Sequence, residues 1–197
     1  MNVAIFGGTF DPVHRGHLAV ARAAARRFRL DRIYFVPADL PPHKQSKSIT
    51  SFLDRYAMLA LALAGEERFV PSAVEFAAGA RRPSYTILTV ARFRRTLKRG
   101  DRLYLLVGAD QFRDLGTWYR VPALVRQVEI IVATRPGSSL AQGWKKLPVG
   151  ARVLVLETQE PVSATQVRRR AARGRALGRL VPPAVAEYIR KTGLYRG

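Results

Sequence analysis

The sequence predicts an α/β protein whose core is a doubly wound parallel sheet with helices on both faces. Three features near the start of the chain indicate this. An unbroken apolar run at 3–6 is typical of a strand that is buried on both faces of a parallel sheet. An amphipathic stretch at 16–28 follows it, and a second apolar run occupies 33–36. Together they form a βαβ unit with a right-handed crossover, as in a Rossmann-like fold.

The rest of the chain continues this alternation of helices and strands. Ser51, with Asp54 three residues later, predicts the start of a helix that runs to Ala64, and Ser84 predicts the cap of the next helix. Further helices are expected from Pro122, after Ser163 and from Pro182. Further strands are expected at 69–76, 103–107, 128–134 and 153–156, with loops at 37–50 and 135–148.

The length of 197 residues is enough for one well-filled domain and short for two. We therefore expect a single domain over 1–197, with a C-terminal helical part at about 160–197. No cysteine is present, so disulfides and thiolate metal sites are excluded. The longest apolar run, at 57–64, is too short to span a bilayer, and we expect no leader because no basic region followed by an apolar stretch stands at the start. A cytoplasmic protein without membrane contact is expected, and a homo-oligomer is left open.

The charge is strongly positive, with 34 Lys and Arg against 14 Asp and Glu, a net charge of +20. Such a balance favours anionic partners, either nucleic acid or small phosphorylated molecules. The arginine clusters lack interleaved aromatic residues that would stack on bases, which favours a solvated face over a nucleic-acid footprint. A basic nucleic-acid-binding protein is nevertheless the alternative from a different functional class.

The segment after the first strand has the pattern of a phosphate site. Gly7 and Gly8 allow the backbone to approach a ligand closely, and the following helix directs its positive N-terminal end toward the same place. His14 and His17 are three residues apart and would share one face of that helix. An ordinary strand-to-helix turn with two solvated histidines is the simpler interpretation of each feature alone. Their combination at the carboxyl end of the first strand favours a ligand site.

Five stretches carry a family resemblance. The run GGTFDPVHRGH at 7–17 resembles the GxFxPxHxGH signature of the nucleotidyltransferase superfamily. The stretches PPHK at 41–44, SYT at 84–86, GADQFRDLGTW at 108–118 and VSATQVR at 162–168 resemble those of nicotinate mononucleotide adenylyltransferases. The resemblance covers nearly the whole chain and implies a nucleotidyltransferase-type fold. Ala164 departs from the second serine that the family has in its last motif.

The resemblance also implies roles for individual residues. The residues implied in catalysis are His14, His17, Lys44 and Arg168. Those implied in ATP binding are Gly7, Gly8, Thr9, Phe10, Gly108, Asp110, Ser163 and Thr165. Those implied in binding the second substrate are Ser84, Tyr85, Thr86, Trp118 and Tyr119. In this scheme the Trp118 indole faces a cationic pyridinium ring, where stacking and cation–π attraction are both available.

The implied reaction joins ATP and nicotinate mononucleotide to give nicotinate adenine dinucleotide and pyrophosphate, a step of NAD synthesis. A phosphate monoester has its second pKa near 6, so it attacks without a strong general base. The enzyme must instead align it with the α-phosphorus and place positive groups around the phosphates, and His14, His17, Lys44 and Arg168 are expected to supply them. Mg²⁺ is expected to arrive with ATP, with no dedicated metal ligands in the protein. Nicotinamide mononucleotide and phosphopantetheine are the alternative acceptors.

Overall fold

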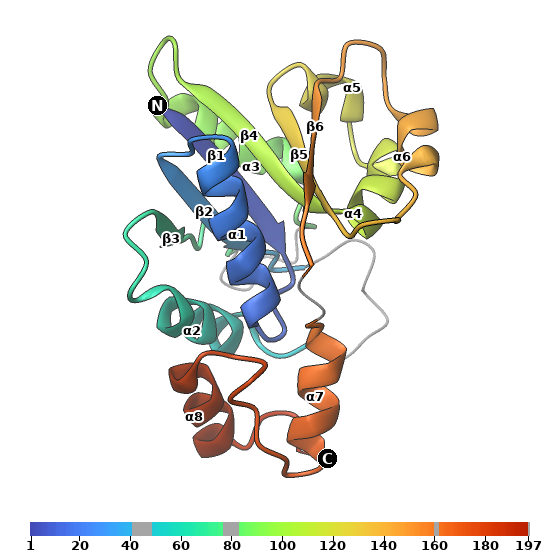
Figure 1. The fold of residues 1–197 in the computed structure, drawn as a ribbon. Helices are drawn as coiled ribbons and strands as arrows, with labels where there is room; N and C mark the ends of the chain where they lie inside the picture. The colour runs from blue at the N-terminus through green and yellow to red at the C-terminus, as the bar shows by residue number, and fades with distance from the viewer. Residues whose placement is uncertain (41–48, 77–82, 160–161, 197) are drawn as a thin grey trace.

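The computed structural model describes residues 1–40, 49–76, 83–159 and 162–196. A six-stranded sheet with the order β3-β2-β1-β4-β5-β6 forms its centre, and every neighbouring pair is parallel (Figure 1). The strands are β1 (Asn2–Gly8), β2 (Arg32–Pro37), β3 (Phe69–Pro71), β4 (Arg102–Gly108), β5 (Glu129–Thr134) and β6 (Val153–Glu157). The expected doubly wound sheet is therefore confirmed.

Helices cover both faces of this sheet (Figure 1). They are α1 (Arg15–Arg27), α2 (Phe52–Leu63), α3 (Thr86–Thr96), α4 (Ala109–Asp114), α5 (Val121–Val125), α6 (Ala141–Lys146), α7 (Ala164–Ala172) and α8 (Pro183–Thr192), with a 3₁₀ turn η1 (Leu115–Thr117). Two apolar cores result. One joins α1, α2, α7 and α8 to the side chains of Ala4 and Phe6, and the other joins α3, α4 and α5 to Val3 and Ile5. The alternation of faces along β1 is the period of two that a strand imposes.

The C-terminal helices α7 and α8 pack on the helical layer that also contains α1 and α2 (Figure 1). Val181, Val185 and Ile189 are buried in the core that includes Phe6. Polar contacts add to this packing, because the Tyr188 hydroxyl donates to Asp54 Oδ1 at 2.8 Å. This end of the chain is thus attached to the rest by a shared core.

Two elements differ from the sequence-based expectation. The strand expected at 69–76 ends at Pro71, and the N–H of Phe76 bonds the carbonyl of Ala73 in a turn instead of continuing a ladder. The loop expected at 135–148 contains the short helix α6. A side chain at Gly143 would come within 2.4 Å of the Phe112 ring, so the glycine allows α6 to lie directly on α4. None of the helices in the described ranges has the length and apolar character needed to cross a bilayer.

Candidate active site

The strand order reverses between β1 and β4, and this places a crevice at their carboxyl ends. β1 ends at Gly8 and leads to α1 on one face, whereas β4 ends at Gly108 and leads to α4 on the other. In open α/β sheets, connections that leave in opposite directions create a crevice between the two strand ends. Ligands of open α/β sheets bind at such a switch point. The predicted phosphate and ribose residues lie at these two strand ends.

The backbone at the end of β1 is open on one side and supported on the other. A side chain at Gly7 would meet no atom within 4 Å, whereas one at Gly8 would come within 3.0 Å of the Phe10 ring. Phe10 is only 2% exposed and takes a left-handed φ of 48°. Its side chain therefore supports the glycine loop from below, and only its backbone is available to a nucleotide. Gly7 is the position where a ligand can approach the main chain.

His14 and His17 lie together at the start of α1. Their rings stack with centroids 3.6 Å apart, and the His14 backbone N–H donates to His17 Nδ1 at 3.2 Å. Because Nδ1 of His17 accepts this bond, the proton of its neutral ring is assigned to Nε2. His14 is buried, and its Nδ1 has no hydrogen-bond partner among the described residues.

Burial changes the charge that was expected of this pair. Removal from water lowers the pKa of His14 to about 4. Burial, and next the nearby His14 ring, lower the pKa of His17 well below its ordinary value. Both rings are therefore neutral at pH 7 in the free protein, and the expectation that they supply positive charge is wrong for this state. They can offer N–H donors instead.

The lowered pKa of His14 predicts acid sensitivity of the fold. The unfolded chain takes up a proton near pH 6.5 and the folded protein only near pH 4, so the stabilisation is complete above pH 6.5 and is lost as the pH falls toward 4. For this ring alone, the free energy of unfolding should fall by about 3 kcal/mol between pH 7 and pH 4. Urea titrations at both pH values test this. The difference in the free energy of unfolding between the two pH values should be smaller in His14→Asn. An equal difference in both proteins would contradict the assignment.

Asp11, in the same loop, was not expected to be a site residue, yet it connects three distant parts of the chain. Its side chain is only 6% exposed. Oδ1 accepts from the Tyr195 hydroxyl at 2.6 Å and Oδ2 from the backbone N–H of Thr50 at 3.3 Å. Its backbone carbonyl accepts from Arg168 Nη1 at 2.6 Å. The C-terminal residues and α7 are thereby held against the loop between β1 and α1.

Arg168, in the last of the motifs, reaches the glycine loop through its bond to the Asp11 carbonyl. Its second Nη atom lies 3.4 Å from the Thr165 hydroxyl, and the Ser163 hydroxyl caps α7 by accepting from the N–H of Gln166 at 3.3 Å. A side chain at Gly16 would come within 3.1 Å of the Val162 carbonyl oxygen. The glycine of the histidine motif therefore allows α1 to start close to the segment that precedes α7.

Arg55, on α2, is a second residue that the sequence analysis missed. It is 1% exposed, and its guanidinium donates to the carbonyls of Thr50 at 2.9 Å, Thr9 at 2.8 Å and Asp39 at 3.5 Å. Burial lowers its pKa, and the charge of Asp11 opposes that shift. A signal was available, since Arg55 lies three residues from both Phe52 and Met58 and so falls on the apolar face of α2.

The bond between Tyr195 and Asp11 can be tested by Tyr195→Phe. The variant leaves one oxygen of a buried carboxylate without its donor, and we expect a loss of about 1–3 kcal/mol in the free energy of unfolding. Tyr56→Phe is the matched control, because no hydrogen bond of the Tyr56 hydroxyl is found within the described residues. Urea unfolding of both variants measures the effect. Equal stability of the two variants would show that the bond contributes nothing.

The residues expected to hold the second substrate lie on α3 and after η1. Ser84 was expected to cap α3, but the cap position is Tyr85. The Ser84 hydroxyl instead accepts the backbone N–H groups of Asp39 at 3.0 Å and Leu40 at 3.3 Å, which anchors the segment after β2. Helix α3 therefore starts without a side-chain cap, because the Ser84 hydroxyl is engaged by the backbone of Asp39 and Leu40.

Aromatic rings gather beside this helix start. The Tyr85 and Tyr119 rings are 4.6 Å apart, and Tyr85 and Trp118 are both partly buried against the core that contains Ile5. Thr86 is the first residue of α3. The structure thus brings the two tyrosines together and places Trp118 at the margin of a core. Lys44 lies outside the described residues.

The other strand end carries Asp110, in the first turn of α4. It is exposed, and a side chain at Gly108 would come within 2.8 Å of its Oδ1. The carboxylate therefore lies directly over the end of β4. The Gly108 N–H donates to Gln111 Oε1 at 3.2 Å, which fixes the start of the helix. An exposed carboxylate in this place can accept hydrogen bonds from ribose hydroxyls.

Comparisons with known proteins show the family to which the chain belongs. Residues 5–170 match the cytidylyltransferase-like family. A protein of Solibacter usitatus, named probable nicotinate-nucleotide adenylyltransferase, is 42% identical, with 99% of this chain and 100% of its own length covered. A protein of the same name from Rubrobacter xylanophilus is 40% identical, with 100% and 92% covered.

Solved structures resemble the fold. The nicotinic acid mononucleotide adenylyltransferase of Plasmodium falciparum, solved with NaAD, superposes with a TM-score of 0.78 over 98% of this chain and 97% of that one, at 19% identity. At that identity the similarity concerns the fold alone. The sequence relatives are much closer and extend over the full length. The chain therefore belongs to the nicotinate-nucleotide adenylyltransferase family, within the cytidylyltransferase-like group.

Proposed function

We propose that the protein transfers AMP from ATP to nicotinate mononucleotide and releases nicotinate adenine dinucleotide and pyrophosphate, a step of NAD synthesis. One observation carries the proposal for the site. The loop that follows β1 has an open backbone position at Gly7, leads into the stacked histidines and accepts a hydrogen bond from Arg168 at the Asp11 carbonyl. Full-length similarity to the nicotinate-nucleotide adenylyltransferases supports the choice of reaction.

ATP would lie across the two strand ends. Its phosphates approach the main chain at Gly7 and the start of α1, where helix N–H groups favour anions. Its ribose is within reach of Asp110 at the end of β4. Ser163, Thr165 and Arg168, at the start of α7, face the departing pyrophosphate in this arrangement. Positive charge comes from Arg168, and from Lys44 as the resemblance implies.

The histidines act as neutral donors in this proposal. The bond from the His14 backbone N–H occupies only Nδ1 of His17. The Nε2–H can therefore donate to an α-phosphate oxygen as negative charge develops there. Donors fixed before the reaction need no reorganisation during it, and the ring stacking holds His17 in place. The acceptor phosphate attacks the α-phosphorus, the bond to the β-phosphate oxygen breaks, and pyrophosphate leaves with that electron pair.

The nicotinate ring would lie between the aromatic residues and the start of α3. Backbone N–H groups at a helix start bind a carboxylate, and Thr86 begins such a helix. Trp118 is placed to stack on the cationic ring, with Tyr85 and Tyr119 as neighbours. Ser84 contributes indirectly, by anchoring the backbone of Asp39 and Leu40.

Mg²⁺ is proposed to enter with ATP. Among the described residues, no three His, Cys, Asp or Glu side chains are grouped as metal ligands, so the donor set fits an ion held by phosphate oxygens and water. When bound, Mg²⁺ neutralises part of the phosphate charge. Because the reaction consumes ATP, a cytoplasmic location is part of the same proposal.

An assay with separate acceptors tests the proposal. Purified protein with Mg-ATP is given nicotinate mononucleotide, nicotinamide mononucleotide or phosphopantetheine, and pyrophosphate and the adenylylated product are measured. We expect rapid turnover with the first acceptor. Equal turnover with nicotinamide mononucleotide would remove the assigned role of the α3 start while leaving the reaction intact. No turnover with any acceptor would overturn the function and favour nucleic-acid binding.

A further inference from the structure

Glu75, in the segment between β3 and α3, is a partly buried carboxylate to which the proposed reaction gives no role. Its Oε1 atom accepts from the hydroxyl of Thr89, a residue of α3 that is only 2% exposed, at 2.5 Å. Burial raises the pKa of the Glu75 carboxyl, and hydrogen bonds from the Thr89 and Ser84 side chains oppose that shift. Arg92 Nη1 donates to the neighbouring Val74 carbonyl. The segment after β3 is thus bonded to α3 at several points.

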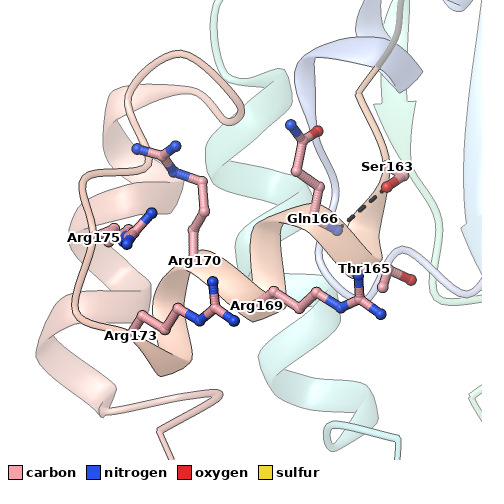
Figure 2. A pocket seen from close by; sticks show the side chains of 7 residues that line it. All are labelled: Ser163, Thr165, Gln166, Arg169, Arg170, Arg173 and Arg175. Atoms are coloured by element: carbon pink, nitrogen blue, oxygen red, sulfur yellow. Dashed lines mark hydrogen bonds between the residues drawn. The ribbon is translucent and has the colours of Figure 1, made fainter.

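Ser84 and Ser163 both precede a helix, and their hydroxyls are used differently. The Ser163 oxygen accepts from the backbone N–H of Gln166, inside its own helix (Figure 2). The Ser84 oxygen instead accepts from two backbone N–H groups of the segment after β2, which occupies both of its lone pairs. Its hydroxyl proton is left to be donated, and the Glu75 carboxylate is the acceptor beside it.

The two hydroxyls that bond Glu75 stand on either side of the first turn of α3. Ser84 comes two residues before Thr86, the first residue of the helix, and Thr89 comes three residues after it. No bond from the backbone N–H of Thr86 or Ile87 to another described residue is found, as is usual at a helix start. These N–H groups are where the proposed function places the carboxylate of the nicotinate ring. One side chain from outside the helix therefore holds both sides of this turn.

We propose that Glu75 is a positioning residue for the acceptor, because it holds the start of α3 in the geometry that binds the ring carboxylate of nicotinate mononucleotide. This inference rests on the proposed function. A carboxylate only accepts hydrogen bonds, so it needs N–H donors that all point toward it, whereas a carboxamide also carries donors of its own. Donors that are fixed in advance avoid the cost of ordering the turn when the acceptor binds. Glu75 therefore favours the nicotinate acceptor over the nicotinamide one.

Calorimetric titration of nicotinate mononucleotide tests this role in Glu75→Met and Glu75→Gln. Both substitutions remove the same charge, but only glutamine keeps an oxygen that can accept from Ser84 and an amide that can donate to Thr89. We expect Glu75→Met to bind the acceptor about tenfold more weakly, because charge-assisted hydrogen bonds are lost, and Glu75→Gln to stay within about threefold of the unaltered protein. Nicotinamide mononucleotide and ATP should bind both variants as they bind the unaltered protein.

The matched control is Glu67→Met, at an exposed position just before β3, which should bind nicotinate mononucleotide like the unaltered protein. Thr89→Val is a second test variant, because it removes one of the two hydroxyls that Glu75 accepts from. It should weaken binding of this acceptor in the same way. Combined with Glu75→Met it should add little further loss, since both substitutions remove the same bond.

Turnover separates positioning of the acceptor from damage to the whole protein. In Glu75→Met, KM for nicotinate mononucleotide should rise about tenfold while kcat stays within about twofold. The reason is that the ring carboxylate is remote from the phosphate that reacts, so its binding is the same before and during the reaction.

Other results would overturn the proposal. Equal weakening toward both acceptors would mean that the substitution disturbs the whole protein. Tighter binding of nicotinate mononucleotide to both Glu75 variants would mean that the carboxylate repels the acceptor. Unchanged binding in Glu75→Met, or no binding of this acceptor to the unaltered protein, would remove the role. Failure of the proposed function is distinguished from these, because the unaltered protein would then bind the acceptor without turning it over.

Discussion

Replacing His17 with alanine is expected to lower kcat for adenylyl transfer by on the order of a thousandfold, the effect of removing a fixed donor from a developing oxyanion. The His17 ring is held by the His14 backbone N–H and by stacking, so it is ready to donate before substrate binds. Pyrophosphate release under saturating Mg-ATP and nicotinate mononucleotide measures the loss. The thermal unfolding midpoint should change far less than the activity.

The matched control for this experiment is Arg152→Ala, at an exposed position that precedes β6. Its turnover should equal that of the unaltered protein. His17→Asn adds a second comparison, because it keeps a polar N–H donor in a shorter side chain and should retain more activity than alanine. Near-normal turnover of His17→Ala in a folded protein would remove His17 from the mechanism.

Replacing Arg55 with methionine is expected to have the largest effect on stability, a loss of about 3–5 kcal/mol in the free energy of unfolding. Methionine fills much of the same space but donates no hydrogen bond. The carbonyls of Thr9 and Thr50 would lose their guanidinium donor in a buried place, and the Asp11 carboxylate would lose a nearby positive charge. The variant should also raise KM for ATP, because the Thr9 carbonyl belongs to the glycine loop.

Urea unfolding compares this variant with Arg68→Met, an exposed arginine just before β3. The control should lie within about 0.5 kcal/mol of the unaltered protein. A loss of similar size in both variants would show that Arg55 contributes only as a surface charge does. An Arg55→Lys variant should recover part of the stability, since one ammonium cannot reach all three carbonyls.

The parts of the fold that follow from local pattern were predictable. The run at 3–6, the glycines after it and the amphipathic stretch that follows give β1, the loop and α1 within one or two residues. The short elements were not predictable from local pattern. The helix α6 has no side-chain cap and contains a glycine, and its presence depends on packing against α4. Ser84 was expected to cap a helix because serine usually does so, but a segment 45 residues away takes its hydroxyl.

The closeness of the two motif histidines was predictable, and their charge was not. The motif brings His14 and His17 together, but their neutrality follows from burial, which no spacing reports. The connection between Asp11 and Tyr195 spans 184 positions and depends on where α8 docks. Contacts of that separation are set by the whole fold, so local sequence cannot specify them.

The most direct test of the central claim is to follow the label from ATP carrying ³²P at either the α- or the γ-phosphate during reaction with nicotinate mononucleotide. Attack at the α-phosphorus, in the crevice between β1 and β4, predicts that α-label appears in the dinucleotide and γ-label in pyrophosphate. Transfer of γ-label to the acceptor, or inorganic phosphate as the labelled product, would mean that the bound ATP reacts at a different phosphorus and that the assignment of the site is wrong.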